Sequence, residues 1–201
     1  MDKAEAQVWY QGLSVEEEKL WFEEKVKSCE NGLLRFAYHL SGNMDKARDL
    51  VQEALLRAYQ YRHSYNANYS FESWMSTILL NVHRQRFRKE KFLKIFHPVK
   101  EREDGEEVEV WDFLESDEEG PEERALKKEV LNFLQEAIEK LPPQMKEVIV
   151  LCDVMNYSYE EVSEIVGCPL GTIRSRLHRA RRKVRDLVEK SYGEDFLSVW
   201  G

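Results

Sequence analysis

Apolar residues recur every three or four positions along most of this chain of 201 residues, with polar residues between them. This spacing is typical of helices that bury one face and expose the other. It predicts helices over residues 15–40, 44–62, 71–96, 122–141, 144–155, 158–166 and 169–187. No stretch alternates apolar and polar residues in the manner of a strand, so the predicted fold class is all-α.

The stretch from Ser158 to Arg185 predicts two helices joined by a tight turn. Ser158 and Glu161 have the spacing of a capping box, and Gly167 is placed to end the first helix in the left-handed conformation. The second helix has an apolar stripe formed by Ile173, Leu177, Ala180, Val184 and Leu187. Its other faces are basic, with no acid between residues 165 and 185. This pattern indicates a DNA-binding helix-turn-helix, against the alternative of a solvated basic helix.

A second candidate for nucleic-acid binding lies around the helix predicted over residues 71–96. The loop before it, residues 63–70, is rich in serine and asparagine and contains two tyrosines that are candidates for stacking on bases. The C-terminal part of this helix is basic, and Phe87 and Phe92 lie between its basic residues. These are Arg84, Arg86, Arg88, Lys89, Lys91 and Lys94. Aromatic rings beside a cationic groove are typical of proteins that hold unpaired strands. The alternative is a packed helix with a solvated basic end.

Charge divides the chain into parts. The whole chain has a net charge of -8, but residues 101–123 hold thirteen acids and one base, Arg102. Without that segment the rest of the chain carries a charge of +4. The predicted architecture is two small helical bundles, residues 15–97 and 122–190, joined by an acidic flexible linker, residues 98–121. An apolar island at residues 108–114 interrupts the linker, and is either a patch that docks on a bundle or a short motif for a partner.

Several functional classes are disfavoured by the sequence. The three cysteines form neither a disulfide framework nor a metal knuckle, which favours a reducing, cytoplasmic compartment. No apolar run approaches the roughly 18 residues of a membrane span, and no signal peptide is predicted. Phosphate-binding loops, nucleophile elbows and metalloprotease motifs are missing, and the five histidines are scattered. We therefore expect no catalytic residues, metal, cofactor or small-molecule substrate, and no enzymatic activity.

The C-terminal half resembles region 4 of bacterial sigma factors, and among these the extracytoplasmic-function (ECF) group. The motifs are L-P-P at 141–143, Y-S-Y-E-E-V at 157–162 and G-C-P-L-G-T-I-R-S-R-L-H-R-A-R at 167–181. The resemblance implies a helix that enters the major groove of the −35 promoter element. The residues at the corresponding positions are Thr172, Arg174, Ser175, Arg176, His178, Arg179 and Arg182.

Residues 33–89 resemble region 2 of the same factors, through L-S-G-N at 40–43, D-L-V-Q-E-A at 49–54, and F-x-x-W at 71–74 leading to Asn81. The resemblance implies that Asp49, Gln52 and Glu53 bind core RNA polymerase. It also implies a set of residues that melts the −10 element and captures a flipped base. These residues are Tyr65, Asn66, Tyr69, Ser70, Phe71, Trp74 and Asn81. It also implies that the adjoining DNA backbone is bound by Arg84, Arg86, Arg88 and Lys89. Two departures stand out: Leu55 replaces a frequent Phe, and Arg84-Gln85 replaces an apolar residue followed by Asp.

The resemblance implies an RNA polymerase sigma factor, whose partners are core polymerase, promoter DNA and an anti-sigma factor, without direct insertion into a membrane. Two other classes remain open. One is a sigma mimic that sequesters an anti-sigma factor, and the other is a stand-alone helix-turn-helix regulator, which has no need of the region-2-like half. Run-off transcription with purified core polymerase separates the three.

Overall fold

The computed structural model describes residues 14–96 and 121–192, so the acidic linker, its apolar island and the C-terminal tail lie outside the described residues. The helices are α2 (Val15–Ser41), α3 (Met44–Gln60), α4 (Phe71–Phe96), α5 (Pro121–Glu139), α6 (Pro143–Ile149), α7 (Tyr159–Val166) and α8 (Leu170–Tyr192). A short 3-10 turn, Arg62–Ser64, follows α3, and a π-helical turn, Val150–Val154, continues α6. The described residues contain helices and no strand, which confirms the all-α prediction.

Local sequence signals account for where the first helices begin and end. Ser14 starts α2 with a capping box, in which its hydroxyl accepts from the Glu17 amide and the Glu17 carboxylate accepts from the Ser14 amide at 2.7 Å. Gly42 ends α2 at a φ of 69°, a left-handed conformation that glycine adopts without a steric cost. Asn43 then caps α3 by accepting a hydrogen bond from the Lys46 amide at 3.0 Å.

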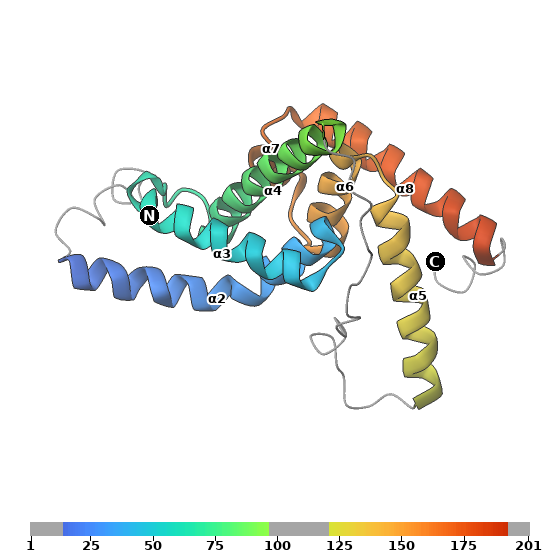
Figure 1. Cartoon of the computed structure of the whole chain (residues 1–201), viewed down its shortest axis with the longest axis horizontal. Helices are drawn as coiled ribbons and strands as arrows, with labels where there is room; N and C mark the ends of the chain where they lie inside the picture. Colours follow the sequence, from blue (N-terminus) through green and yellow to red (C-terminus); the bar gives the residue numbers. More distant parts are fainter. Residues whose placement is uncertain (1–13, 97–120, 193–201) are drawn as a thin grey trace.

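The helices form two groups, α2–α4 and α5–α8, that lie against each other (Figure 1). Within the first group α2, α3 and α4 contact one another, and in the second α8 contacts α5, α6 and α7. The main contact between the groups is made by α4 with α7, and α2 also contacts α5. Because of these contacts, segments more than 60 residues apart in sequence share one interface.

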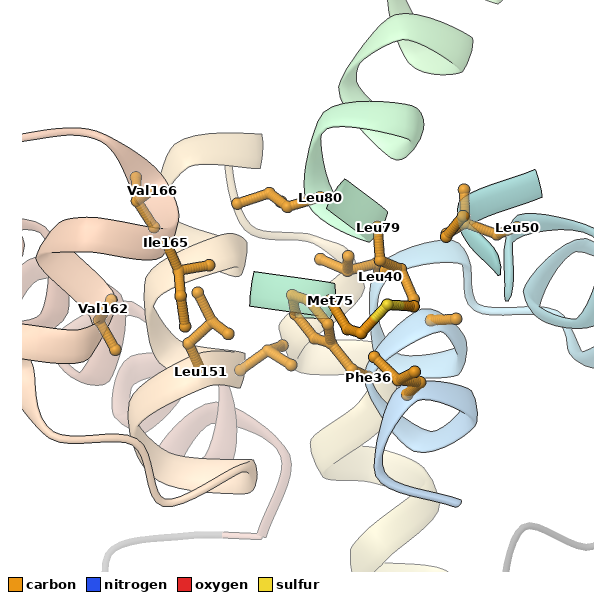
Figure 2. Packing of buried hydrophobic residues seen from close by; sticks show 14 of the residues in the cluster. Phe36, Leu40, Leu50, Met75, Leu79, Leu80, Leu151, Val162, Ile165 and Val166 are labelled. Atoms are coloured by element: carbon orange, nitrogen blue, oxygen red, sulfur yellow. The ribbon is translucent and has the colours of Figure 1, made fainter. Parts of the chain in front are cut away.

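A continuous apolar core runs through both groups (Figure 2). Met75, Leu79 and Leu80 of α4 are fully buried and lie between the two sets of side chains. On one side they meet α2 and α3 through Phe36, Leu40 and Leu50, and on the other they meet the second group through Leu151, Ile165 and Val166. Burial of apolar side chains is the main stabilising contribution here, at roughly 1.5–3 kcal/mol for each large residue. The core therefore resists separation of the two groups.

Polar contacts add to this interface. The Ser76 and Tyr157 hydroxyls are 3.0 Å apart, and Ser76 is almost fully buried. His39 Nδ1 lies 2.5 Å from the side-chain oxygen of Gln135. No helix in the described part of the chain is long and apolar enough to cross a membrane.

Candidate nucleic-acid interface

The helix-turn-helix is built as the sequence predicts. Ser158 caps α7, accepting from the Glu161 amide at 3.2 Å, while the Glu161 carboxylate accepts from the Ser158 amide at 2.9 Å. Gly167 ends α7 at a φ of 74°. The hydroxyl of Ser163 donates to the carbonyl of Cys168 at 2.6 Å and closes the turn. The apolar stripe of α8 is buried at Ile173, Leu177 and Ala180. The two helices therefore have a fixed relative orientation.

The predicted −35 residues lie along the opposite side of α8. Arg174, Ser175, His178, Arg179 and Arg182 are exposed, whereas Thr172 and Arg176 are half-buried. Among the arginines of this helix, Arg181 has a different role, because it donates to both oxygens of Asp153 at 2.6 and 2.9 Å. These hydrogen bonds raise the pKa of Arg181 above its ordinary value. The exposed cations form the surface suited to DNA phosphates and base edges.

The loop before α4 is held by its own hydrogen bonds. Tyr65 donates from its hydroxyl to the carbonyl of Tyr69 at 2.9 Å, and the Asn66 side-chain oxygen accepts from the Asn68 amide at 3.0 Å. Ser70 caps α4 by accepting from the Ser73 amide at 3.0 Å. Asn66 and Tyr69 are exposed. The loop therefore presents polar and aromatic groups on an ordered backbone.

Behind the loop lies an aromatic cluster that joins Tyr65, Phe71 and Trp74, with ring centroids 5.3–5.5 Å apart. Trp21 of α2 completes the cluster at 5.8 Å from Tyr65 and 5.6 Å from Phe71. Tilted and edge-to-face rings at these separations attract one another. Phe71 is 7% exposed, so its ring supports the cluster from within, while Trp74 is half-buried. Sequence reasoning missed Trp21, because the helical period of α2 does not indicate which distant loop a residue meets.

The predicted polymerase-binding residues face two directions. Asp49 and Gln52 are exposed on α3, whereas Glu53 points towards α4. Glu53 pairs with Arg57 at 2.6 Å and with Arg86 at 2.6 Å. Partial burial raises the pKa of Glu53, but the hydrogen bond and charge of Arg86, together with Arg57, lower it overall. Asp49 and Gln52 are thus the two members of this set that lie open to a partner.

The basic end of α4 is divided in the same way. Arg88 and Lys89 are exposed, while Arg86 donates to Glu53 and also to the carbonyl of Asp49 at 3.1 Å. Arg84 turns to the second helical group and donates to both oxygens of Glu147, at 2.9 and 2.7 Å. This charge-assisted hydrogen bonding raises the pKa of Arg84. Two of the four predicted backbone contacts are therefore engaged within the protein.

Comparisons with known proteins agree with the predicted family of both halves of the chain. The Sigma-70 region 2 family matches residues 26–92, and the Sigma-70, region 4 family matches residues 133–184. The ECF RNA polymerase sigma factor EcfG of Rhodopseudomonas palustris is 36% identical over 180 residues, covering 86% of this chain and 88% of that protein. The ECF RNA polymerase sigma factor SigE of Mycolicibacterium smegmatis is 32% identical over 173 residues, covering 86% of this chain and 63% of that protein. This chain belongs to the ECF group of the sigma-70 family.

A solved structure shows the same fold. The sigma factor RpoE of Bartonella quintana, in complex with the anti-sigma factor NepR, is 25% identical to this sigma factor. The match covers 85% of this chain and 98% of that one, with a TM-score of 0.64. The family resemblance predicted from the motifs is therefore confirmed.

A cleft between α4 and the second helical group of this sigma factor brings together a few of the predicted residues. Its volume is about 460 Å³, and its lining includes Asn81 and Arg88 of α4 together with Arg176 of α8. A neighbouring cleft of about 380 Å³ lies against His83 and Lys146. Burial and the charge of Lys146 lower the pKa of His83 to about 4, so its imidazole is neutral at pH 7.

Other chemistry has little support in the described residues. They contain no cluster of three or more histidines, cysteines and acids suited to a metal ion. Burial raises the pKa of Cys29 and Cys152 to about 11, which keeps both thiols protonated at pH 7.

Proposed function

We propose that this sigma factor binds core RNA polymerase and divides promoter recognition between its two halves. Residues 15–97 bind the polymerase through the outward side chains of Asp49 and Gln52 and open the −10 element. Residues 122–190 read the −35 element through α8. The chain acts as a dissociable specificity subunit in the cytoplasm rather than as an enzyme.

One observation supports this proposal: the same chain has an exposed basic helix, α8, and a separate cluster of aromatic rings beside an exposed loop. Duplex DNA is read by a rigid helix that fits the major groove, which matches the exposed arginines of α8. An unpaired base is held by stacking on aromatic rings, which matches the cluster of Tyr65, Phe71 and Trp74. A stand-alone regulator has no use for the second surface.

An anti-sigma factor is part of the proposal. Its support is the Bartonella relative, whose structure is that of a complex with such a partner. A sigma mimic would bind the same partner but would not direct transcription. The deciding measurement is thus transcription and not anti-sigma binding.

The experiment is run-off transcription with purified core polymerase on a promoter selected from genomic fragments. We expect a transcript whose start site depends on this protein. Asp49→Lys together with Gln52→Glu alters the outward face of α3 and should remove co-purification with the core enzyme. Glu24→Gln, at an exposed position of α2, gives the same change in net charge and is the control for charge alone. No transcript from any promoter would refute the proposal.

A further inference from the structure

The first two turns of α2 lie ahead of the part of the chain that matches the region 2 family. That match begins at residue 26, whereas α2 begins at Val15. The capping box formed by Ser14 and Glu17 satisfies free amides at this end of the helix, which would otherwise fray. The helix is therefore ordered from its first turn, before the matched region starts.

Glu18 connects the first turn of α2 to the 3-10 turn that precedes the loop. Its carboxylate accepts from Arg62 Nε at 3.1 Å and from Arg62 Nη2 at 3.0 Å. The Glu18 side chain is 12% exposed and that of Arg62 is 17% exposed, so salt and water screen this pair less than an exposed one. Arg62 Nη1 also donates to the Tyr59 carbonyl at 3.0 Å, and the guanidinium carbon lies 4.6 Å from the centre of the Tyr59 ring. Arg62 is thus held by α2 on one side and by the end of α3 on the other.

Two aromatic residues in the second turn of α2 contact the other end of the loop. The centroid of the Trp21 ring lies 5.8 Å from that of Tyr65 and 5.6 Å from that of Phe71. Phe22 is 7% exposed, and its ring centroid lies 5.9 Å from that of Phe71. Both contacts with Phe71 are edge-to-face, a favourable geometry for aromatic rings. The loop therefore meets α2 at both ends, through Arg62 and through Phe71.

We propose that Glu18, Trp21 and Phe22, which we name the α2 brace, hold the loop of residues 62–70 in the shape that captures an unpaired base. Ordering a loop on binding costs conformational entropy, so a loop that is already ordered binds the base more tightly. Glu18 and Trp21 are positioning residues, because they act on the loop and its rings. The inference rests on the proposed function, and it adds that base capture depends on residues ahead of region 2.

The first measurement is hydrogen exchange on the full chain without polymerase. Three amides of the braced segment donate hydrogen bonds within the turn and the loop, those of Ser64, Tyr65 and Tyr69. Their exchange rates report how often the segment opens. Glu18→Gln and Trp21→Ala should each raise exchange in residues 62–70 by roughly tenfold, because each removes a contact that holds the closed loop. Exchange in α6, α7 and α8 should not change.

The second measurement uses holoenzyme assembled with core polymerase. The probe is a fluorescent single strand of about 12 nucleotides, with the non-template −10 sequence of a promoter identified by run-off transcription. Glu18→Gln and Trp21→Ala should weaken binding of this probe by roughly tenfold, a loss comparable to that of one stacked base. Binding of the −35 duplex by the same holoenzyme should stay within roughly twofold, whereas general destabilisation would lower both affinities together.

The matched control is Glu24→Gln, which removes one negative charge from an exposed position of the same helix. It should change neither the exchange rates nor the probe affinity by more than roughly twofold. Trp21→Phe keeps an aromatic ring at the same position and should retain most of the probe affinity. Equal effects of Glu24→Gln and Glu18→Gln would show that charge alone is responsible, and would refute the brace.

A milder variant keeps the test decisive if Trp21→Ala does not fold. Ser14→Ala removes the cap of α2 and should raise exchange in residues 62–70 in the same direction, by a smaller factor. Unchanged exchange in both Glu18→Gln and Ser14→Ala overturns the inference, as does faster exchange with an unchanged probe affinity. A parent protein that directs no transcription overturns the proposed function instead, and the exchange rates of the free chain still decide whether α2 holds the loop.

Discussion

The two regions of this sigma factor that we propose face DNA are built on opposite plans. The recognition helix takes all its predicted contacts from one continuous element, α8, whose buried stripe determines which residues face outwards. The melting region combines a loop, the start of α4 and Trp21 of α2, and its rings support one another. The first plan suits a rigid duplex, while the second suits bases that must be trapped after unstacking.

The cations of the two regions differ as well. On α4, Arg84 and Arg86 are committed to carboxylates within the protein. On α8, most arginines are exposed, and Arg181 pairs with Asp153. We infer that duplex affinity comes chiefly from α8, and that Arg88 and Lys89 are the cations of α4 that lie open to DNA.

The largest expected effect concerns the core beneath α8. Leu177→Ala should lower the free energy of unfolding by about 3 kcal/mol, because Leu177 is 2% exposed and its removal leaves a cavity. The affinity for duplex DNA should fall together with the stability. Chemical denaturation measures the change. Leu56→Ala, at a position 67% exposed, is the control and should remain within about 0.5 kcal/mol of the parent. Equal losses in both variants would contradict this account of α8.

The next prediction separates duplex reading from melting. Arg174→Ala should lower affinity for the −35 duplex by roughly 10- to 100-fold, the value of one good arginine–guanine pair. Asn81→Ala should leave closed-complex binding nearly unchanged and reduce permanganate reactivity of thymines near the start site. A premelted −10 bubble should rescue Asn81→Ala but not Arg174→Ala. Rescue of both, or of neither, would remove the proposed division of labour.

A pH effect of similar size should come from the interface. The pKa of folded His83 is about 4, below its ordinary 6.5, so the unfolded chain takes up the proton first. Stability should be complete above about pH 6.5 and fall by about 2 kcal/mol by pH 5. The charged groups near His83 are Lys146, Arg84 and Glu147. Burial also lowers the pKa of His39, so protonation of His39 in the unfolded chain likewise reduces stability as the pH falls.

Thermal melts between pH 8 and pH 5 measure this dependence, and His83→Asn is the control. The melting temperature of the variant should depend less on pH over the same range, because the lowered pKa of His39 is the histidine contribution that remains. A profile identical to that of the parent protein would mean that His83 is not the group that titrates.

The smallest expected effect uses the two capping boxes, one in each region. Ser14→Ala and Ser158→Ala remove the same chemical group and should each cost about 1 kcal/mol. Only Ser158→Ala should weaken duplex binding, because α7 positions α8. Calorimetry gives the stabilities and fluorescence anisotropy the affinities. Equal loss of duplex binding in both would show that α2 also positions the recognition helix.

Much of this protein was predictable from local pattern. The helical period located the elements, and the serine and glycine caps located several of their ends, because those signals act within a few residues. The family motifs and the buried stripe of α8 were equally local. The distinction between exposed Asp49 and inward-facing Glu53 was not predicted, since both lie in one matching motif.

The sequence by itself determined the helices, the helix-turn-helix, the segregation of charge and the family. Only the tertiary structure decided which charges meet: Arg84 with Glu147, 63 residues away, and Arg62 with Glu18, 44 residues away. It also decided that Trp21 packs against Tyr65 in the loop before α4. The physical reason is range: helix period and capping are set by neighbours in the chain, whereas an ion pair or a ring contact depends on how whole helices pack.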